Sequence, residues 1–153
     1  MQEYIRELVC SYKRVRVETD EPIAKRISNS ADAAQVMGFL RDTDRERFAV
    51  IHLNAKNKVL SYEIISVGTL TGSLVHPREV FKGAILANAA ALVLVHNHPS
   101  GDPTPSAEDI AVTTRLFQAG NVLGIEILDH VVIGDSGHRS LAGLGLIPRT
   151  SDN

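Results

Sequence analysis

The pattern of apolar and polar positions divides the chain into two kinds of segment. Three segments place apolar side chains at helical spacing or open with a residue favoured at a helix start, which predicts helices. Other segments are short runs rich in strand-forming residues, which predicts strands. The predicted helices span 28–41, 77–89 and 106–119, and the predicted strands span 48–53, 59–67, 91–95 and 125–133.

The order of these elements predicts an α/β fold. The strands 48–53 and 59–67 are joined by a turn-like segment, so we expect an antiparallel hairpin. The strand 91–95 is apolar at every position, which is typical of a strand covered on both faces. Because helices and strands intermix, we expect a mixed β-sheet flanked by helices, with irregular structure from residue 137 onward. We also expect Ser30 to cap the first helix.

The length of the chain sets the number of domains. Its 153 residues are enough for one domain with its own hydrophobic core. We assign this domain to residues 28–147. We expect residues 1–27 to form an N-terminal arm or an extra strand, and residues 148–153 to form a tail.

Charge limits the kinds of partner. The net charge of -2 gives no overall electrostatic attraction to nucleic acid or to a membrane. DNA is thus a partner that the charge does not support. The basic residues near the N-terminus are expected to form a solvated surface; they are Lys13, Arg14, Arg16, Lys25 and Arg26.

Cysteine content and hydropathy bear on location. The single cysteine, Cys10, cannot form an intrachain disulfide, which fits a reducing compartment. The most apolar run, 84–95, is too short to span a bilayer and is interrupted by Asn88. Charged residues within the N-terminal stretch argue against a signal peptide. We therefore expect no membrane insertion and, by default, a cytoplasmic location.

The sequence His-Asn-His-Pro, which begins at His96, directly follows the fully apolar strand. Residues i and i+2 of an extended segment point to the same side, so His96 and His98 can hold one ion together. Asp109 can supply an oxygen ligand, and Ser106 lies just before it. Two imidazoles and one carboxylate leave a tetrahedral zinc ion one open position, which is typical of a catalytic site.

Each part of this pattern also has a structural explanation. Ser106 and Asp109 fit a capping box, in which the serine caps a helix and the acid bonds back to it. A single histidine at a strand end is commonly an ordinary exposed polar residue. The occurrence of the two histidines, the serine and the aspartate together favours a metal site. A buried strand, followed by a stiff loop with three prolines at 99–105, would bring their side chains together.

The spacing resembles the JAMM motif of the JAB/MPN metalloprotease superfamily: His-x-His, seven residues, Ser, two residues, Asp. Surrounding strings are similar to its bacterial RadC branch, namely VHPREVF at 75–81, ANAA at 87–90 and HNHPSG at 96–101. The similarity runs over about residues 28–147 and implies a JAB/MPN domain of cytidine-deaminase-like architecture. RadC proteins also carry a preceding helix-hairpin-helix region; residues 1–27 are too few for one, so we expect a short form.

The resemblance implies a zinc-dependent metalloprotease, either a peptidase or an isopeptidase, with a peptide or protein substrate. Its metal ligands would be His96, His98 and Asp109, which would hold one zinc ion per chain. Ser106 would hold the metal-bound water or the developing oxyanion.

The resemblance also implies a glutamate on an early strand as general base. By its order along the chain Glu46 is the better match, since it lies just before the strand 48–53. Glu79 is the competitor. It lies in the first turn of a predicted helix, where a carboxylate has a structural reason to be.

Three other functions fit the sequence less well. A non-catalytic scaffold of this superfamily typically lacks a metal ligand, whereas this chain keeps all three and the serine. A DNA-repair-associated accessory or DNA-binding protein of the RadC family, without peptidase activity, is disfavoured by the net charge of -2. A zinc deaminase needs a glutamate where position 98 is histidine, and a Cys-x-x-Cys that a single cysteine cannot provide.

The remaining histidines are weaker candidates for the site. We expect His52 to be a core or sheet-face residue, His76 to lie at a helix entry, and His138 to lie in a loop without a partner. His130 could support a metal ligand from behind, but a structural role is the favoured interpretation.

Overall fold

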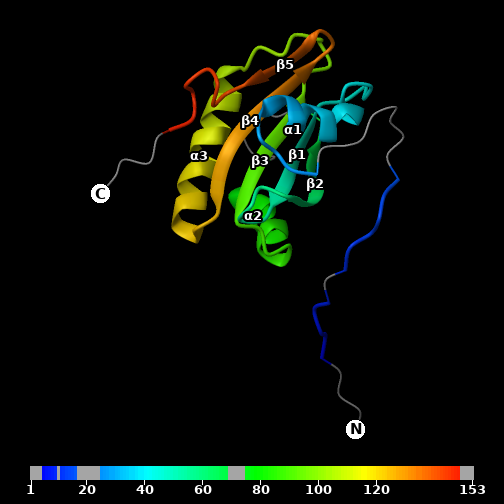
Figure 1. Ribbon diagram of the computed structural model, residues 1–153, viewed down its shortest axis with the longest axis vertical. Coiled ribbons are helices and arrows are strands. Elements are labelled where there is room, and N and C mark those ends of the chain that lie inside the picture. The colour runs from blue at the N-terminus through cyan, green and yellow to red at the C-terminus, as the bar shows by residue number, and fades with distance from the viewer. Residues whose placement is uncertain (1–4, 10, 17–24, 69–74, 149–153) are drawn as a thin grey trace.

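The chain folds into one mixed β-sheet with helices on both faces (Figure 1). The computed structural model describes residues 5–9, 11–16, 25–68 and 75–148. Within these residues the helices are α1 (Ser30–Val36), α2 (Pro77–Leu86) and α3 (Ala107–Leu123), with a 3₁₀ turn η1 (Gly38–Leu40). The strands are β1 (Arg47–Leu53), β2 (Val59–Val67), β3 (Ala91–Asn97), β4 (Glu126–Gly134) and β5 (Gly137–Ser140).

The strands lie in the order β2-β1-β3-β4-β5. β1 pairs antiparallel with β2 and with β3, β3 pairs parallel with β4, and β5 pairs antiparallel with β4. The α/β fold, the mixed sheet and the hairpin expected from the sequence are therefore confirmed. β3 is central and buried at every position, as its apolar sequence predicted.

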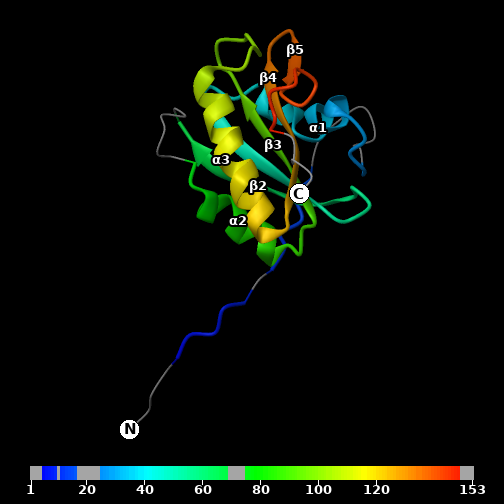
Figure 2. The same ribbon diagram turned by 90° about the vertical axis from the view of Figure 1, so that its left-hand side faces the viewer.

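Alternate residues of β1 and of β3 pack against different helices. Ala49 and Ile51 of β1 lie in the core beneath α1, whereas Phe48 lies in the core beneath α2 and α3. Figure 2 shows the same division, with α3 on one side of the sheet and α1 on the other. In β3, Leu92 and Leu94 belong to the side of α2 and α3. Polar residues that continue this alternation therefore also face α3.

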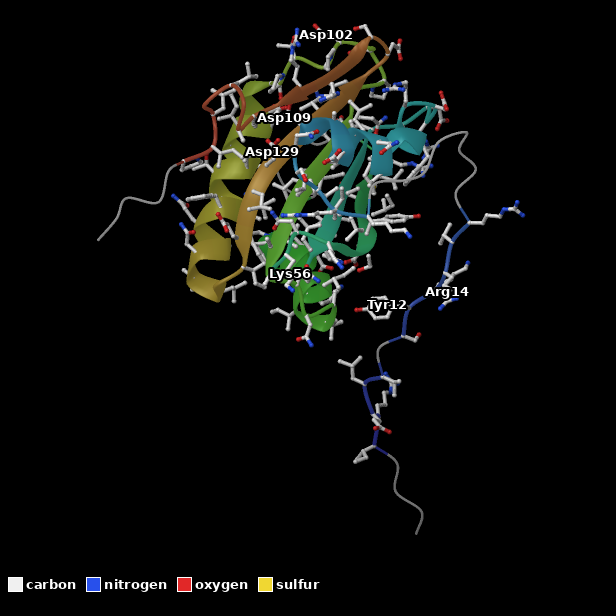
Figure 3. All side chains as sticks on the ribbon, viewed as in Figure 1. Tyr12, Arg14, Lys56, Asp102, Asp109 and Asp129 are labelled. Atoms are coloured by element: carbon white, nitrogen blue, oxygen red, sulfur yellow. The ribbon has the colours of Figure 1, made fainter. Side chains whose placement is uncertain are left out.

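The N-terminal segment stands apart from the sheet. Leu8 and Tyr12 are exposed, and Figure 3 shows Tyr12 and Arg14 on an extended stretch outside the body of the sheet and helices. The basic residues identified near the N-terminus are exposed, as expected for a solvated surface. Cys10 lies outside the described residues. Among the described helices, none combines the length and apolar character needed to cross a bilayer.

The first helix is shorter than predicted and begins at a different cap. Asn29, not Ser30, is the N-cap, and its side chain accepts the backbone N–H of Asp32. The predicted Ser30 cap was wrong because asparagine caps a helix equally well and stands one position earlier. The helix ends at Val36, and the chain then tightens into the 3₁₀ turn at Gly38.

Residues with a left-handed backbone end the other two helices. Asn88 adopts φ 55°, and α2 accordingly stops at Leu86 rather than at residue 89. Gly124 adopts φ 70°, and α3 runs past the predicted end at residue 119 to Leu123.

Residues 137–140 form β5 instead of the irregular structure predicted. Gly137 adopts φ 140°, which lets the chain turn back along β4. His138 lies on this strand, and its Nε2 lies 3.2 Å from Ser30 Oγ, so the expectation that it has no partner was wrong. The contact between Ser30 and His138 joins residues that are far apart in the sequence, so no local pattern could predict it.

Candidate metal centre

The carboxyl end of β3 brings two histidines to one side of the sheet. His96 is the penultimate residue of β3 and His98 follows the strand, so both side chains face α3. Their Nε2 atoms lie 2.8 Å apart. The His96 side chain is fully buried, whereas that of His98 keeps 16% of its surface exposed and can be approached from solvent.

The first turn of α3 supplies a buried carboxylate. Asp109 Oδ1 lies 3.2 Å from His96 Nε2, and Asp109 Oδ2 lies 3.4 Å from His98 Nε2. The capping box is present: Ser106 Oγ accepts the backbone N–H of Asp109, and Asp109 Oδ2 accepts the backbone N–H of Ser106. The cap thus fixes the carboxylate against the histidines. Figure 3 shows Asp109 toward the same end of the molecule as Asp102, which lies in the loop after His98.

Glu46 reaches this cluster from the strand beside β3. β1 pairs antiparallel with β3, with Phe48 opposite His96, so the residue just before β1 lies beside the end of β3. Glu46 Oε1 lies 3.8 Å from His96 Nε2. One ligand atom from each of four residues falls within 4.8 Å of the others; they are Glu46, His96, His98 and Asp109. The structure therefore brings together the predicted ligands and the predicted base, whose roles stay predictions.

Glu79, the competing carboxylate, lies elsewhere. It is on the first turn of α2, and its Oε2 lies 2.8 Å from Lys82 Nζ. The hydrogen bond from Lys82, and then the charge of Lys82, lower the pKa of Glu79. Glu79 is outside the four-residue cluster found among the described residues. Its contacts are those of an exposed helix residue.

The electrostatics of the cluster favour a cation. Burial by itself would raise the pKa of Asp109, but hydrogen bonds with His96 and His98 and the N–H of Ser106 hold this pKa well below its ordinary value. The hydrogen bond with Asp109 raises the pKa of His98 against the effect of burial. His98 Nδ1 donates to the carbonyl of Asp102 at 2.8 Å, which leaves Nε2 to face the carboxylate. The Asp109 carboxylate is a buried anion, and a positive charge beside it would offset the cost of its burial.

Asn97 lies between the two histidines and points to the other face of β3. Its Oδ1 accepts the backbone N–H of Arg47 at 2.8 Å. Its Nδ2 donates to the carbonyl of Arg45 at 3.0 Å and to Thr43 Oγ1 at 2.9 Å. These bonds hold the backbone on both sides of Glu46. This role was not predicted from the sequence, where the available signal was an amide inside a buried strand.

His130 of β4 lies behind His96. It is fully buried, and its Nε2 lies 2.7 Å from His96 Nδ1 while its Nδ1 lies 2.6 Å from Thr113 Oγ1. Burial lowers the pKa of His130 well below its ordinary value, so the ring is neutral. The sequence favoured a structural role, but the residue contacts a candidate ligand directly. The signal that could have shown this was a histidine within an apolar strand.

Two other histidines take structural positions, as predicted. His52 is buried, and its Nδ1 lies 2.8 Å from Ser61 Oγ. Burial lowers the pKa of His52 to about 4, so the ring is uncharged at neutral pH. His76 is the N-cap residue of α2, which is the helix entry expected from the sequence.

Ser106→Ala is expected to lower the free energy of unfolding by about 1 kcal/mol, because alanine cannot accept the N–H of Asp109. Ser106→Gly also lacks the hydroxyl, but glycine at an N-cap costs only roughly a few tenths of a kcal/mol. Urea unfolding of both variants without metal measures the difference. A Ser106→Ala protein as stable as the wild type would contradict a stabilising cap at this position.

Comparison with known proteins gives the family. Residues 27–146 match the RadC-like JAB domain. A UPF0758 protein of Desulforamulus reducens is 60% identical over 112 residues, which cover 73% of this chain and 49% of the relative. A UPF0758 protein of Desulfitobacterium hafniense is 52% identical over 134 residues, covering 86% of this chain and 59% of the relative.

A more distant relative, a UPF0758 protein of Methanosarcina acetivorans, is 44% identical over 135 residues, covering 88% of this chain and 59% of the relative. The chain thus spans about half the length of the curated relatives it matches. The family match, these identities and the mixed sheet agree with the resemblance that the motif suggested. The chain belongs to the RadC-like JAB domain family.

Proposed function

We propose that this chain is a zinc-dependent metallohydrolase that cleaves peptide or isopeptide bonds in a peptide or protein substrate. The observation that carries the proposal is the convergence of four side chains, whose ligand atoms lie within 4.8 Å of one another; they are Glu46, His96, His98 and Asp109. The JAB domain supports this kind of chemistry. The chain spans about half the length of its relatives. The activity of the whole protein is therefore part of what we propose.

The donor set suits one zinc ion per chain. Imidazole nitrogen and carboxylate oxygen are common zinc ligands, and three protein ligands are typical of a catalytic zinc. His96 and His98 would bind through Nε2, and Asp109 through Oδ1, since its Oδ2 already accepts the N–H of Ser106. Zinc held in this way would supply a Lewis acid, which would lower the pKa of a water molecule to roughly 7.

The other two residues would move a proton and stabilise charge. Glu46 would take the proton of the attacking water and pass it to the leaving nitrogen. Its Oε1 lies 3.8 Å from His96 Nε2, farther than the nearest oxygen of Asp109, which suits a base beside the ligands. The hydroxyl of Ser106 would donate to the oxyanion, a contribution worth about 3 kcal/mol for one donor.

Metal analysis tests the site on which this function depends. After equilibration with zinc and removal of the excess, we expect about one zinc ion per wild-type chain and almost none in the His96→Ala, His98→Ala double variant. A His76→Ala, His138→Ala double variant is the control, since both residues lie outside the cluster. It should keep the wild-type zinc content. Equal, sub-stoichiometric zinc in the wild type and in the His96, His98 variant would overturn the proposal.

A further inference from the structure

A hollow lies between β2, α2 and the N-terminal segment, and we call it the β2–α2 hollow. β2 is an edge strand of the sheet, and α2 packs beside it. The hollow has a volume of about 830 Å³. Ser61, Glu63 and Gly83 line it from the strand and the helix, and residues 11–15 line it from the N-terminal segment. Figure 1 shows this segment on the β2 side of the molecule. None of the four residues of the candidate metal centre lines the hollow.

A buried polar atom beside the hollow has no partner. His52 of β1 lines the hollow and is only 3% exposed. Its Nδ1 lies 2.8 Å from Ser61 Oγ, but its Nε2 has no hydrogen-bond partner among the described residues. Glu63 Oε2 lies 4.0 Å from Nε2, which is too far for a hydrogen bond. Because an unpaired buried polar atom is costly, this cluster lacks a group that could bond to it.

Glu63 brings a negative charge to the same place. Its side chain keeps 36% of its surface exposed, and its carboxylate lies against Gly83, where a Cβ atom would clash with Oε2. Glycine at this position therefore makes room for the carboxylate, although it weakens the helix. Burial raises the pKa of Glu63, and the charge of Lys82 opposes this effect. Lys82 is hydrogen-bonded to Glu79, so the charge of Glu63 can still be neutralised by a second cation.

The ligand that fits these groups is a basic side chain. An ammonium or guanidinium group carries several N–H donors, so it can pair with the Glu63 carboxylate and also donate to a lone pair on His52 Nε2. The 4.0 Å between Nε2 and Oε2 is short enough for one nitrogen to lie within hydrogen-bond distance of both. Lys13 and Arg14 line the same hollow, and both are exposed.

The N-terminal segment is long enough to reach Glu63 of its own chain. Arg26 pairs with Lys58 just before β2, which fixes where the chain joins the sheet. Glu63 lies roughly 17 Å farther along the strand. The stretch from Arg16 to Arg26 can span up to roughly 33 Å when extended. A basic side chain from the same chain can therefore enter the hollow without a second copy.

We propose that the β2–α2 hollow is a binding site for a basic side chain, and that residues 11–16 of the same chain dock there through Lys13 or Arg14. The docked segment would pair with Glu63 and cover Leu60 and Leu86, which line the hollow and are 39% and 46% exposed. It would also lie along the edge of β2, where an uncovered strand invites pairing with other chains. The inference does not depend on the proposed function, because it uses no residue of the metal centre.

Limited digestion of the full chain with trypsin tests the docking, because cleavage after Lys13 and Arg14 needs the segment to leave the hollow. Glu63→Gln removes the charge at nearly constant shape. We expect it to speed cleavage at these two sites by roughly 3- to 10-fold, the effect of losing a partly shielded ion pair. Glu126→Gln is the control, since Glu126 is an exposed strand residue outside the hollow, and it should match the wild type. Cleavage after Arg6, also outside the hollow, should be the same in all three proteins.

A double variant, Lys13→Gln with Arg14→Gln, tests the pairing itself, with cleavage after Arg16 as the measurement. In this background Glu63→Gln should no longer speed cleavage. Cleavage after Lys56, in the turn between β1 and β2, reports unfolding of the sheet and should stay constant. Wild-type rates in Glu63→Gln would overturn the inference, and so would an acceleration that persists in the double variant. Protection that grows with protein concentration would assign the hollow to a second copy and overturn docking within one chain.

Discussion

Glu46→Gln is expected to leave the zinc content unchanged and to slow hydrolysis by about 10²- to 10⁴-fold. Glutamine has nearly the shape of glutamate, but its amide cannot take a proton from water at neutral pH. The metal should stay, because Asp109 Oδ1 lies 3.2 Å from His96 Nε2 whereas Glu46 Oε1 lies 3.8 Å away. An effect on rate without an effect on metal content is the result that distinguishes a base from a ligand.

Incubation with a proteome-derived peptide library, followed by mass spectrometry of new amino termini and of released isopeptide branches, measures this rate. Glu79→Gln is the matched control, since Glu79 is half-exposed on α2 and bonds to Lys82. It should cleave at the wild-type rate. A fully active Glu46→Gln protein would move the role of base elsewhere. A zinc-loaded wild type that cleaves no more than the His96, His98 double variant would contradict hydrolysis itself.

The residues proposed as metal ligands could be predicted to lie together because short local patterns contain them. His96 and His98 alternate at the end of an apolar strand, so their common side follows from strand geometry alone. Ser106 and Asp109 are three residues apart, which is the spacing of a capping box at a helix start. In both cases the deciding contact lies within one element, and the structure has these elements close to their predicted positions.

Glu46 is different, because its place depends on which strands pair. Glu46 lies close to His96 because β1 pairs antiparallel with β3 and places Phe48 opposite His96. No spacing near Glu46 encodes that register, and only the resemblance to a known family suggested the residue.

The contacts of the polar residues behind His96 could not be predicted for a related reason. Thr113 and His130 belong to α3 and β4, and each is satisfied by a partner on another element. A buried polar residue in an apolar segment signals that some partner exists, because leaving it unpaired is costly. It does not say which partner, so their chain to His96 became visible only in three dimensions.

Asn97→Ala is expected to slow hydrolysis by about 10- to 100-fold with zinc still bound, because a base displaced by about 1 Å loses a rate factor of this order. The Asn97 amide bonds to the backbone of Arg45 and of Arg47, the two neighbours of Glu46. Alanine leaves these groups unpaired, which should also lower the free energy of unfolding by about 1–3 kcal/mol. The zinc content should not fall, since His96 and His98 point to the opposite face of β3 from Asn97.

A general loss of stability could slow hydrolysis without any role in positioning, and Asn54→Ala separates the two effects. Asn54 Oδ1 accepts the backbone N–H groups of Lys56 and Lys58 in the turn between β1 and β2. Its loss should destabilise that turn while leaving the residues around Glu46 in place. If the two variants unfold at similar urea concentrations and only Asn97→Ala loses activity, Asn97 positions the base. If both lose activity in proportion to their stability, the amide serves the fold alone.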